Sequence, residues 1–459
     1  MRRFFALSAA ALLVVFAAGM PEPAEPETPD FTQVVSPVVE AGQAAIWYCA
    51  WIDSGALSDA YVSIGAIPNV DVSISLPSPI ANEEADTAEL SITGPGSVSQ
   101  DVAEIVRRGA APGFVDLSSG PGAVSATVVT DRSLSGDACV ASVSKLWQLS
   151  GGTTKAGRTT ILRLYNPFPE NAKLTITATS EFGTAPLPTL RSVDVPGRSW
   201  RDIDLAVEIP FFDELALTVA SDEGLIIPSL VLVGEQGGEA SWPGTGLSTL
   251  WDFPIIDPGG LSPSLVVTNP GDSDVTVEVD VFTDDGAVPA AVVVVVAPNV
   301  PARIPLDDYA GVGSAVRVRA DGPVAAVVVA EDLVLSDSSQ EEQEEGEQLI
   351  RIAGTVGSQR PARQWLVIGP GSVPGASSAL WLLNTSDQPV TVTITGLPSD
   401  GSVPQVDKLI IAPTANLRIP ADRAGVVGYF VDAPEPISAA WSAEAEWGVM
   451  MGSGVPINE

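Results

Sequence analysis

The sequence predicts an all-β protein: four tandem immunoglobulin-like β-sandwich repeats that follow an N-terminal signal segment. Three observations predict this fold. One hairpin pattern recurs along the chain, apolar residues alternate with polar ones, and turn residues follow at short intervals. A β-propeller is the alternative, but propeller repeats usually span about 40–50 residues, so each repeat here would have to form a double blade.

The N-terminus is typical of an export signal. Arg2 and Arg3 precede an apolar run from Phe4 to Ala18, and small residues suited to cleavage follow. As a helix the run would span about 22 Å, less than a hydrocarbon layer of roughly 30 Å. We therefore expect residues 1–20 to be a signal peptide or, if uncleaved, a membrane anchor. Residues 21–42 are rich in Pro and acid and predict an extended linker.

The repeated hairpin has an asparagine at its turn. Its three copies are ILRLYNPFPENAKLTITA, SLVVTNPGDSDVTVEV and ALWLLNTSDQPVTVTITG, which place Asn166, Asn269 and Asn384 at the same position. Acidic residues in the turn, such as Asp272 and Asp274, are not shared by the copies. The hairpin is therefore predicted to be scaffold and not a binding site.

Two further landmarks keep their spacing from the asparagine. A tryptophan precedes each asparagine by 18 or 19 residues, and a glycine follows it after 17 residues: Trp147, Trp251 and Trp365; Gly183, Gly286 and Gly401. A weaker copy surrounds Asn69, with Trp47 and Trp51 upstream. The tryptophans could be sugar-binding platforms, but we expect them to close the core of each repeat.

The spacing divides the chain into four predicted sandwiches. They cover residues 43–145, 146–246, 247–361 and 362–459. The third is longer than the others, and its excess falls in an acidic loop at 336–348. Within the repeats the alternation of Val275, Val277 and Val279 with polar residues predicts half-buried strands. Residues 290–296, AAVVVVV, do not alternate and predict a strand covered on both faces.

The chain has two cysteines, Cys49 and Cys139, near the two ends of the first sandwich. In an exported protein we expect them to form a disulfide. Two unrelated buried thiols and a redox-active pair are the alternatives.

Composition excludes several classes of function. The 22 basic and 57 acidic residues give a net charge of −35, which opposes binding to nucleic acid and leaves the membrane accessible only through an N-terminal anchor. The absence of histidine excludes histidine-based catalysis and zinc sites. We expect no catalytic residue, no cofactor and no metal site.

Carboxylate pairs alone do not predict a calcium site. Three such pairs occur in turns: Asp272 and Asp274, Asp284 and Asp285, Asp307 and Asp308. Aspartate in turns ordinarily bonds the neighbouring backbone, whereas calcium requires six to eight oxygens from a shaped loop.

At the level of the repeat the chain resembles exported bacterial proteins built of tandem immunoglobulin-like modules. The features that carry this resemblance are Asn269, the strand Val275–Val279, Pro298 and the segment Pro323–Ala326. With WYC at Trp47–Cys49 after a short signal segment, the whole chain resembles an uncharacterised actinobacterial exported family. The resemblance implies a location in the cell envelope and supplies no active site.

We therefore expect an exported, extracellular or cell-envelope scaffold that binds an envelope protein and is not an enzyme. The alternative is a glycan-binding or accessory subunit of envelope polysaccharide assembly, with a cell-wall glycan as partner. A hydrolase that uses only carboxylates is the second alternative.

Overall fold

The computed structural model describes residues 39–40, 45–53, 55, 58–77, 84–106, 112–185, 187–234, 237–283, 286–332, 351–370, 373, 375–423 and 425–458. The predicted signal segment at 1–20, most of the linker at 21–42 and the acidic loop at 336–348 lie outside these residues. Residues Val34–Glu459 form one compact unit. In the described part of this unit no helix is long and apolar enough to cross a membrane.

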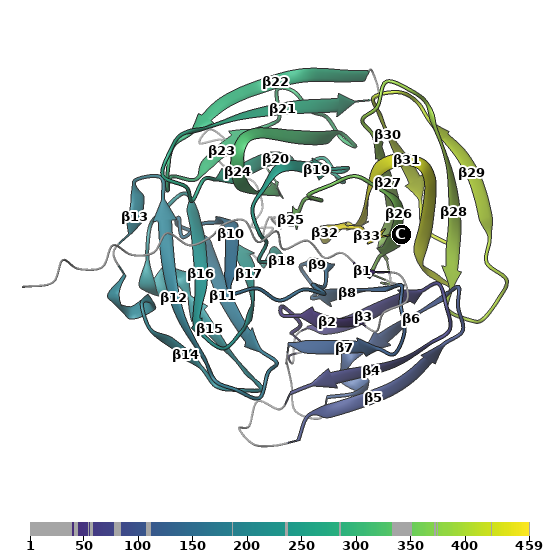
Figure 1. Cartoon of the computed structure of the whole chain (residues 1–459), viewed down its shortest axis with the longest axis horizontal. Helices are drawn as coiled ribbons and strands as arrows, with labels where there is room; N and C mark the ends of the chain where they lie inside the picture. The colour runs from purple at the N-terminus through teal and green to yellow at the C-terminus, as the bar shows by residue number, and fades with distance from the viewer. Residues whose placement is uncertain are drawn as a thin grey trace, which may run out of the picture. The chain divides into compact units, whose positions relative to one another are not determined.

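The described residues are nearly all in β-strands, as the sequence predicts. The strands fall into four consecutive groups, which we call modules 1 to 4 (Figure 1). Each module contains two antiparallel sheets. In modules 3 and 4 one long strand, β24 (Ala315–Glu331) or β31 (Val426–Ala445), runs through both sheets and joins them.

In module 1 one sheet has the order β2-β7-β4-β5 and the other β6-β3-β8-β9. The elements are β2 (Ala45–Cys49), β3 (Asp59–Ala66), β4 (Val70–Leu76), β5 (Asp86–Ile92), β6 (Gly96–Asp101), η1 (Val102–Glu104), β7 (Gly113–Leu117), β8 (Gly122–Val129) and β9 (Leu134–Ala138).

In module 2 one sheet has the order β10-β16-β12-β13, with β14 also on β12, and the other β15-β11-β17-β18. The elements are β10 (Leu146–Gly152), β11 (Arg158–Asn166), β12 (Ala172–Ser180), β13 (Gly183–Ala185), η2 (Pro188–Leu190), β14 (Val193–Val195), β15 (Ser199–Asp204), α2 (Leu205–Glu208), β16 (Leu215–Glu223), β17 (Ile227–Gly234) and β18 (Glu239–Pro243).

In modules 3 and 4 the corresponding strands pair in the same way around β24 and β31. The other elements of module 3 are β19 (Ser248–Phe253), β20 (Ser262–Thr268), β21 (Val275–Thr283), β22 (Gly286–Val296), β23 (Ala302–Pro305) and β25 (Ile352–Val356). Those of module 4 are β26 (Ala362–Ile368), β27 (Ser377–Asn384), β28 (Val390–Pro398), β29 (Val406–Ile411), β30 (Ala415–Pro420), β32 (Gly448–Ser453) and β33 (Val455–Asn458).

The period of two along the strands sorts side chains between core and solvent. Val275, Val277 and Val279 on β21 are buried, whereas Thr276 and Glu278 between them are only half-buried. The tryptophan at the head of each module is buried to the same degree: Trp47, Trp147, Trp251 and Trp365 are each 0% exposed. Because they are fully buried, these indoles fill the cores. They expose no ring surface on which a sugar could pack.

The prediction for residues 290–296 is wrong. These residues form most of β22, which is an edge strand and pairs only with β21. Val292 and Val294 face inward, but Val293 is 55% and Val295 is 64% exposed. A run of valines without alternation therefore does not require cover on both faces, because β22 leaves one apolar face in solvent.

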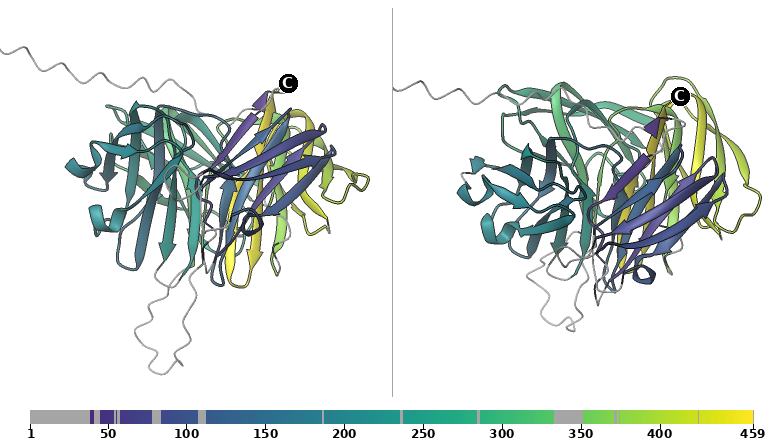
Figure 2. Two further views of the ribbon diagram at one scale, coloured as in Figure 1. Left: turned by 90° about the horizontal axis from the view of Figure 1, so that it is seen from below. Right: turned by 60° about the horizontal axis from the view of Figure 1, so that its bottom comes forward.

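The four modules surround a common centre (Figures 1 and 2). The inner strand of each module contacts its two neighbours there: β9 and β25 each contact both β18 and β32. At the junction of modules 4 and 1, β1 (Val39–Glu40) pairs in parallel with β33. The modules are thus placed as propeller blades would be, but each has two sheets.

Each junction between modules has its own side chains. Arg163 joins module 2 to module 1, and Val266 of module 3 enters the core of module 2. Trp381 of module 4 enters the core of module 3, and Ile368 of module 4 packs against module 1 near Gly65. The core within a module follows a repeated pattern, whereas the contacts that close the ring do not repeat.

Candidate functional site

The hairpin asparagine is a structural clamp. Asn269 is 0% exposed, its Nδ2 donates to the carbonyl oxygens of Ser273 (2.7 Å) and Val296 (3.0 Å), and its Oδ1 accepts from the amide of Gly271 (3.0 Å). Asn166 and Asn384 make the same three bonds at their own turns. A buried amide whose two donors and oxygen are directed at its own backbone is not available to a ligand.

Cys49 and Cys139 form the predicted disulfide. Both are 0% exposed, and their Cα atoms are 4.8 Å apart. The neighbouring residues Tyr48 and Val140 exchange backbone hydrogen bonds of 2.8 and 3.0 Å, which fix the two cysteines opposite each other. A buried disulfide between β2 and the segment after β9 is a structural staple, and neither alternative for the cysteines fits this geometry.

A cleft lies between modules 1 and 2 and is bordered by described residues of both. It encloses about 870 Å³, within the range of small-ligand sites. Its described walls are Ser75, Pro77, Glu84, Ala85, Asp86, Thr87, Ile105 and Phe114 from module 1, and Tyr165, Pro167, Pro169 and Arg198 from module 2. Carboxylates come from one module, a guanidinium from the other, and aromatic and proline rings from both.

An ion pair between β11 and β15 contacts module 1 close to the cleft. Arg163 lies two residues before Tyr165 on β11, and its guanidinium donates to both carboxylate oxygens of Asp202 (2.8 Å each) and to the carbonyl of Ile52 (3.0 Å). Burial lowers the pKa of Arg163, but Asp202 and Asp53 raise it by more, so the group stays charged. This contact joins β11 of module 2 to the segment that follows β2 in module 1.

Two residues of the cleft are unusual: Tyr165 has a hydroxyl without a hydrogen-bond partner among the described residues, and Arg198 has a strained backbone. The Tyr165 hydroxyl is buried and has no hydrogen-bond partner among the described residues; burial raises its pKa, so it remains a neutral donor. Arg198 has a φ of 54°, which is uncommon for a residue other than glycine. Its amide donates to Phe168 (2.8 Å), and that bond fixes the turn from which the side chain reaches the cleft.

A buried carboxylate lies at the centre of the ring. Asp137 on β9 is 0% exposed and accepts from the amides of Ala138 (2.7 Å), Ser453 (2.8 Å) and Val356 (3.3 Å), and from the Thr355 hydroxyl (3.0 Å). Burial raises its pKa to about 7, against these four bonds, which lower it. The adjoining cavity encloses only about 40 Å³, room for little more than water. Asp137 therefore ties module 1 to modules 3 and 4.

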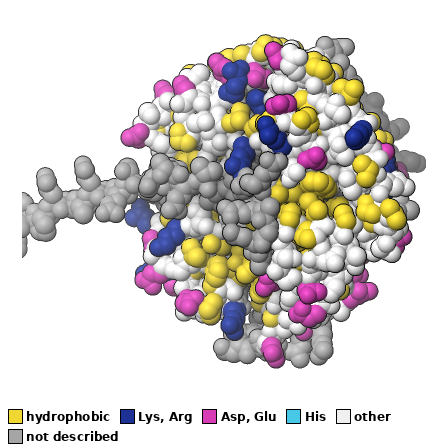
Figure 3. Space-filling model, turned by 45° about the vertical axis from the view of Figure 1, so that its right-hand side comes forward, with side chains coloured by type: hydrophobic (Ala, Val, Ile, Leu, Met, Phe, Trp, Pro, Cys, Tyr) yellow, Lys and Arg dark blue, Asp and Glu magenta, His cyan; other side chains and the backbone are white. Residues whose placement is uncertain are grey.

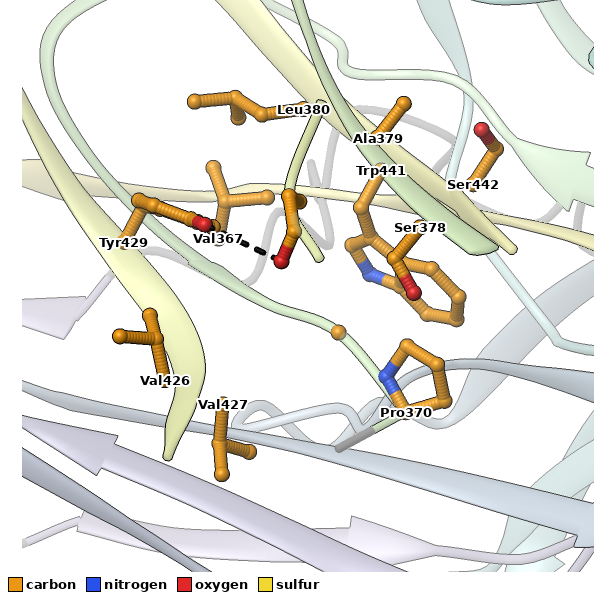
Figure 4. A pocket seen from close by; sticks show the side chains of 12 residues that line it. Val367, Pro370, Ser378, Ala379, Leu380, Val426, Val427, Tyr429, Trp441 and Ser442 are labelled. Carbon is orange, nitrogen blue, oxygen red and sulfur yellow. Dashed lines mark hydrogen bonds between the residues drawn. The ribbon is translucent and has the colours of Figure 1, made fainter. Parts of the chain in front are cut away.

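A second small pocket lies inside module 4 (Figure 4). Val367, Leu380, Tyr429 and Trp441 are among the residues that line it, and the Tyr429 hydroxyl donates to the carbonyl of Ala421 (3.2 Å). The enclosed space is about 30 Å³. This is a packing defect between two sheets and too small for an organic ligand.

The carboxylate pairs singled out in the sequence do not line the cleft. Asp307 accepts from the Ser262 hydroxyl (2.7 Å), and Asp272 and Asp274 are exposed at the hairpin turn of module 3. Asp284 and Asp285 lie outside the described residues. The described part of the chain contains no group of three or more His, Cys, Asp or Glu residues that could hold a metal ion.

Sequence reasoning missed the residues of the cleft. Glu84 and Asp86 stand just before and at the start of β5, and Arg198 stands in a turn of another module. Neither segment carries a motif. The acidic run NEEAD before a strand is the one available indication, and it does not identify a partner arginine more than 100 residues away.

Comparisons with known proteins give one family and weak structural likenesses. A family model described as a family of unknown function (DUF5719) matches residues 97–344, more than half of the chain. No curated protein matches the chain. A crystal structure of Thermotoga maritima 1070 is 23% identical, covers 21% of this chain and 95% of its own, and has a TM-score of 0.18.

The second likeness is to a tetra-tandem repeat in the extending region of a large adhesion protein. It is 13% identical over 91% of this chain and 100% of that one, with a TM-score of 0.11. At TM-scores this low neither structure bears on the fold or the function of this chain.

Proposed function

Because the chain belongs to DUF5719, a family of unknown function, we propose its role from its own surfaces: an exported scaffold of the cell envelope that binds a partner protein and catalyses no reaction. The observation that carries the proposal is the division between interior and surface. The residues that the modules share, such as Asn269 and Trp251, are 0% exposed. The outer turns and the junctions differ from module to module, and recognition resides in such surfaces.

The proposal includes the finer fold and the location. In module 2, β11 pairs with β15 in one sheet and β12 with β16 in the other. If β13 and β14, which both pair with β12, are counted as one strand, these pairings join the second strand to the fifth and the third to the sixth, as in an immunoglobulin-like sandwich. The Cys49–Cys139 disulfide supports export, because such bonds persist mainly in oxidising compartments.

Crosslinking in the native envelope tests the scaffold. A photoreactive residue is placed at exposed outer positions of each module, for example at Val403 in module 4 and Phe182 in module 2. The expected result is one recurrent partner protein, crosslinked from one module and not from all four. Equal, weak labelling of many proteins from every position would contradict a specific scaffold.

The second candidate function is glycan binding, which the cleft between modules 1 and 2 favours. Sugars are bound by rings that pack on their C–H faces and by charged groups that bond their hydroxyls. Phe114 and three prolines supply the first, and Glu84, Asp86 and Arg198 supply the second. A DUF5719 chain that binds cell-wall oligosaccharides here would act as an accessory to polysaccharide assembly.

Titration with cell-wall oligosaccharide fragments tests this candidate. Arg198→Gly removes the guanidinium and relieves the positive φ, so it should weaken binding without harming the fold. Glu84→Gln removes one carboxylate and serves as the second variant. Unchanged binding in both variants, or no binding by the wild type, excludes the cleft. Product analysis of the same mixtures shows whether the third alternative, carboxylate-only hydrolysis, occurs.

A further inference from the structure

Three apolar side chains project from the outer margin of module 2. Phe182 is 84%, Phe211 82% and Val207 75% exposed. Phe182 stands in the turn between β12 and β13, Val207 is on α2, and Phe211 follows α2 in the loop before β16. We call Phe182, Val207 and Phe211 the phenylalanine tip; Figure 2 shows the short helices of module 2 at this margin.

Hydrogen bonds with Thr154 and Glu181 hold the backbone of the phenylalanine tip in place. Thr154 exchanges backbone hydrogen bonds with Phe211 (3.1 Å) and Phe212 (2.9 Å), and its hydroxyl donates to the carbonyl of Ile209 (2.5 Å). The Glu181 carboxylate accepts from the amides of Asp213 and Glu214, both at 3.2 Å. Glu181 thereby joins the turn of Phe182 to the loop of Phe211.

The backbone at Phe211 is strained, and its ring gains no burial in return. Its φ is 67°, a left-handed conformation that is an outlier for a bulky residue. The ring of Phe212 packs edge-on against Phe182 at 6.1 Å, but Phe211 itself extends into solvent. Folding alone would favour glycine at this position, so a phenylalanine there indicates a use for the exposed ring.

The same turn has another residue in the sister modules. The position before Gly183 is Phe182, whereas the positions before Gly286 and Gly401 are Asp285 and Asp400. The Asp400 carboxylate accepts from the amide of Ser402 (3.0 Å), an ordinary aspartate turn. Module 2 therefore departs from its copies by replacing a turn-forming polar residue with an exposed aromatic ring.

The charges around the phenylalanine tip are acidic. Glu181, Glu208 and Asp213 flank it, and none of them forms an ion pair with a described residue, although Lys155 and Arg303 lie near Glu214. Elsewhere, as on the face in Figure 3, exposed hydrophobic side chains lie in patches among acidic and basic ones. An acidic rim opposes insertion into an anionic bilayer and favours a cationic partner.

We propose that the phenylalanine tip is the docking surface of DUF5719 module 2 for a protein segment that offers apolar side chains flanked by lysine or arginine. Two rigid aromatic anchors in fixed positions bind at low cost in conformational entropy. The flanking carboxylates then select partners of opposite charge. This inference rests on the proposed scaffold function and names the chemistry of its partner.

The test uses the full chain and a displayed library of random peptides. We expect enriched peptides with apolar residues flanked by lysine or arginine, whose binding weakens as salt increases. Phe182→Asp restores the turn residue of the sister modules, and Phe211→Gly removes the ring while relieving the positive φ. Each should lower the affinity of a selected peptide about tenfold or more with no loss of thermal stability. Val403→Asp is the matched control: Val403 is 88% exposed on module 4, and its change should leave the affinity unaltered.

Three results would overturn the proposal. The first is a library that enriches no peptide over the Phe182→Asp, Phe211→Gly double variant. The second is binding to vesicles of phosphatidylethanolamine and phosphatidylglycerol that Phe211→Gly abolishes, which assigns the tip to a lipid surface. The third is self-association that the same variant abolishes, which assigns it to a second copy. None of these three results tests the scaffold function, which the crosslinking experiment decides separately. Failure of this inference and failure of the proposed function can therefore be told apart.

Discussion

Module 1 differs from the other three modules in how the segment after its inner strand is fixed to its first strand. In each module the segment after the inner strand pairs with the first strand, as in Tyr48 with Val140 and Asp252 with Ser358. Next to that pair, modules 2 to 4 have a glycine: Gly244, Gly357 and Gly454. In module 1 this position is Cys139, bonded to Cys49.

The glycines make room for a large neighbour. A Cβ atom on Gly357 would lie 2.8 Å from the ring of Phe253, and one on Gly454 would lie 3.1 Å from Trp365 and from Val367. By the strand register, Phe253 and Val367 stand where Cys49 stands in module 1. One structural position is thus filled either by a covalent bond or by a glycine beneath a bulky side chain.

The residue at the hairpin turn also differs between module 1 and modules 2 to 4. Asn166, Asn269 and Asn384 each make three bonds at their turns, whereas in module 1 the strand β3 ends in Ala66 where β11 ends in Asn166. Asn69, just before β4, accepts from the amide of Gly94 (3.0 Å), as Asn171 before β12 accepts from the amide of Gly197 (3.0 Å). The comparison teaches that module 1 has no asparagine clamp at this turn and has a disulfide that the other modules lack. Four changes would break or sharpen this contrast, from the largest expected effect to the smallest.

The disulfide should carry the largest effect. Replacing Cys49 and Cys139 by serine opens a loop whose ends are 90 residues apart, and the chain-entropy model puts such a loop at about 4–5 kcal/mol of unfolding free energy. Urea unfolding followed by tryptophan fluorescence, with and without reductant, measures this loss. The paired change Cys49→Phe with Cys139→Gly copies module 3 and should recover part of it. A serine pair as stable as the wild type would contradict the staple.

Asp137 should give module 1 a stability that depends on pH. Its pKa is about 7 in the folded chain against an ordinary value of 3.8. Below about pH 4 the carboxyl is neutral in both states. Between pH 4 and 7 the unfolded chain releases the proton first, so the free energy of unfolding falls, by roughly 4 kcal/mol over the window if the full difference is realised.

Asp137→Asn is the control for that prediction. Its neutral amide cannot titrate, so the difference between wild type and variant should vary with pH only between about 4 and 7. The variant is also less stable at low pH, because its NH₂ group meets the donors of Ser453, Thr355 or Val356. Parallel pH profiles for the two proteins would exclude a role for Asp137.

The asparagine clamp should be worth somewhat less. Asn269→Ala removes three hydrogen bonds, and the carbonyls of Ser273 and Val296 lose the donor that the asparagine supplies, an expected loss of about 3 kcal/mol. Asn69→Ala in module 1 should cost less than about 1 kcal/mol, because one bond is lost at an exposed turn. Urea midpoints of the two variants measure the difference, and equal losses would remove the contrast.

The smallest effect is expected at the glycine itself. Gly357→Ala places a methyl group against the Phe253 ring, and such overpacking costs about 1–3 kcal/mol. Phe253→Leu in the same chain should relieve part of the strain. The thermal midpoints of the single and double variants measure this coupling; additive losses would show that the two residues do not compete for the same space.

The elements inside a module could be predicted because the chain repeats them. The spacing of Asn269 from Trp251 and the alternation along β21 identify turn, core and strand without reference to other modules. The closed ring could not be predicted, because its junctions use unrelated pairs: Arg163 with Ile52, or Ile368 with Gly65. The cleft follows from one such junction, so its residues have no pattern in the sequence.

The error at residues 290–296 has a related cause. Period and composition report how apolar a strand is, but not whether another sheet lies beside it. β22 has the composition of a central strand and the place of an edge strand. The exposed rings of Phe182 and Phe211 were also invisible to a search for repeats, because they occur where module 2 departs from its copies.

The pairing of β1 with β33 has a topological consequence. The strand that leads into module 1 hydrogen-bonds to the last strand of module 4, so the start and the finish of the described chain are neighbours. The geometry therefore defines a cyclic order of modules and no first module. A chain cut between modules 2 and 3 and rejoined at its old ends would encode the same ring, because circular permutation succeeds where termini are close and the new cut falls in a surface connection.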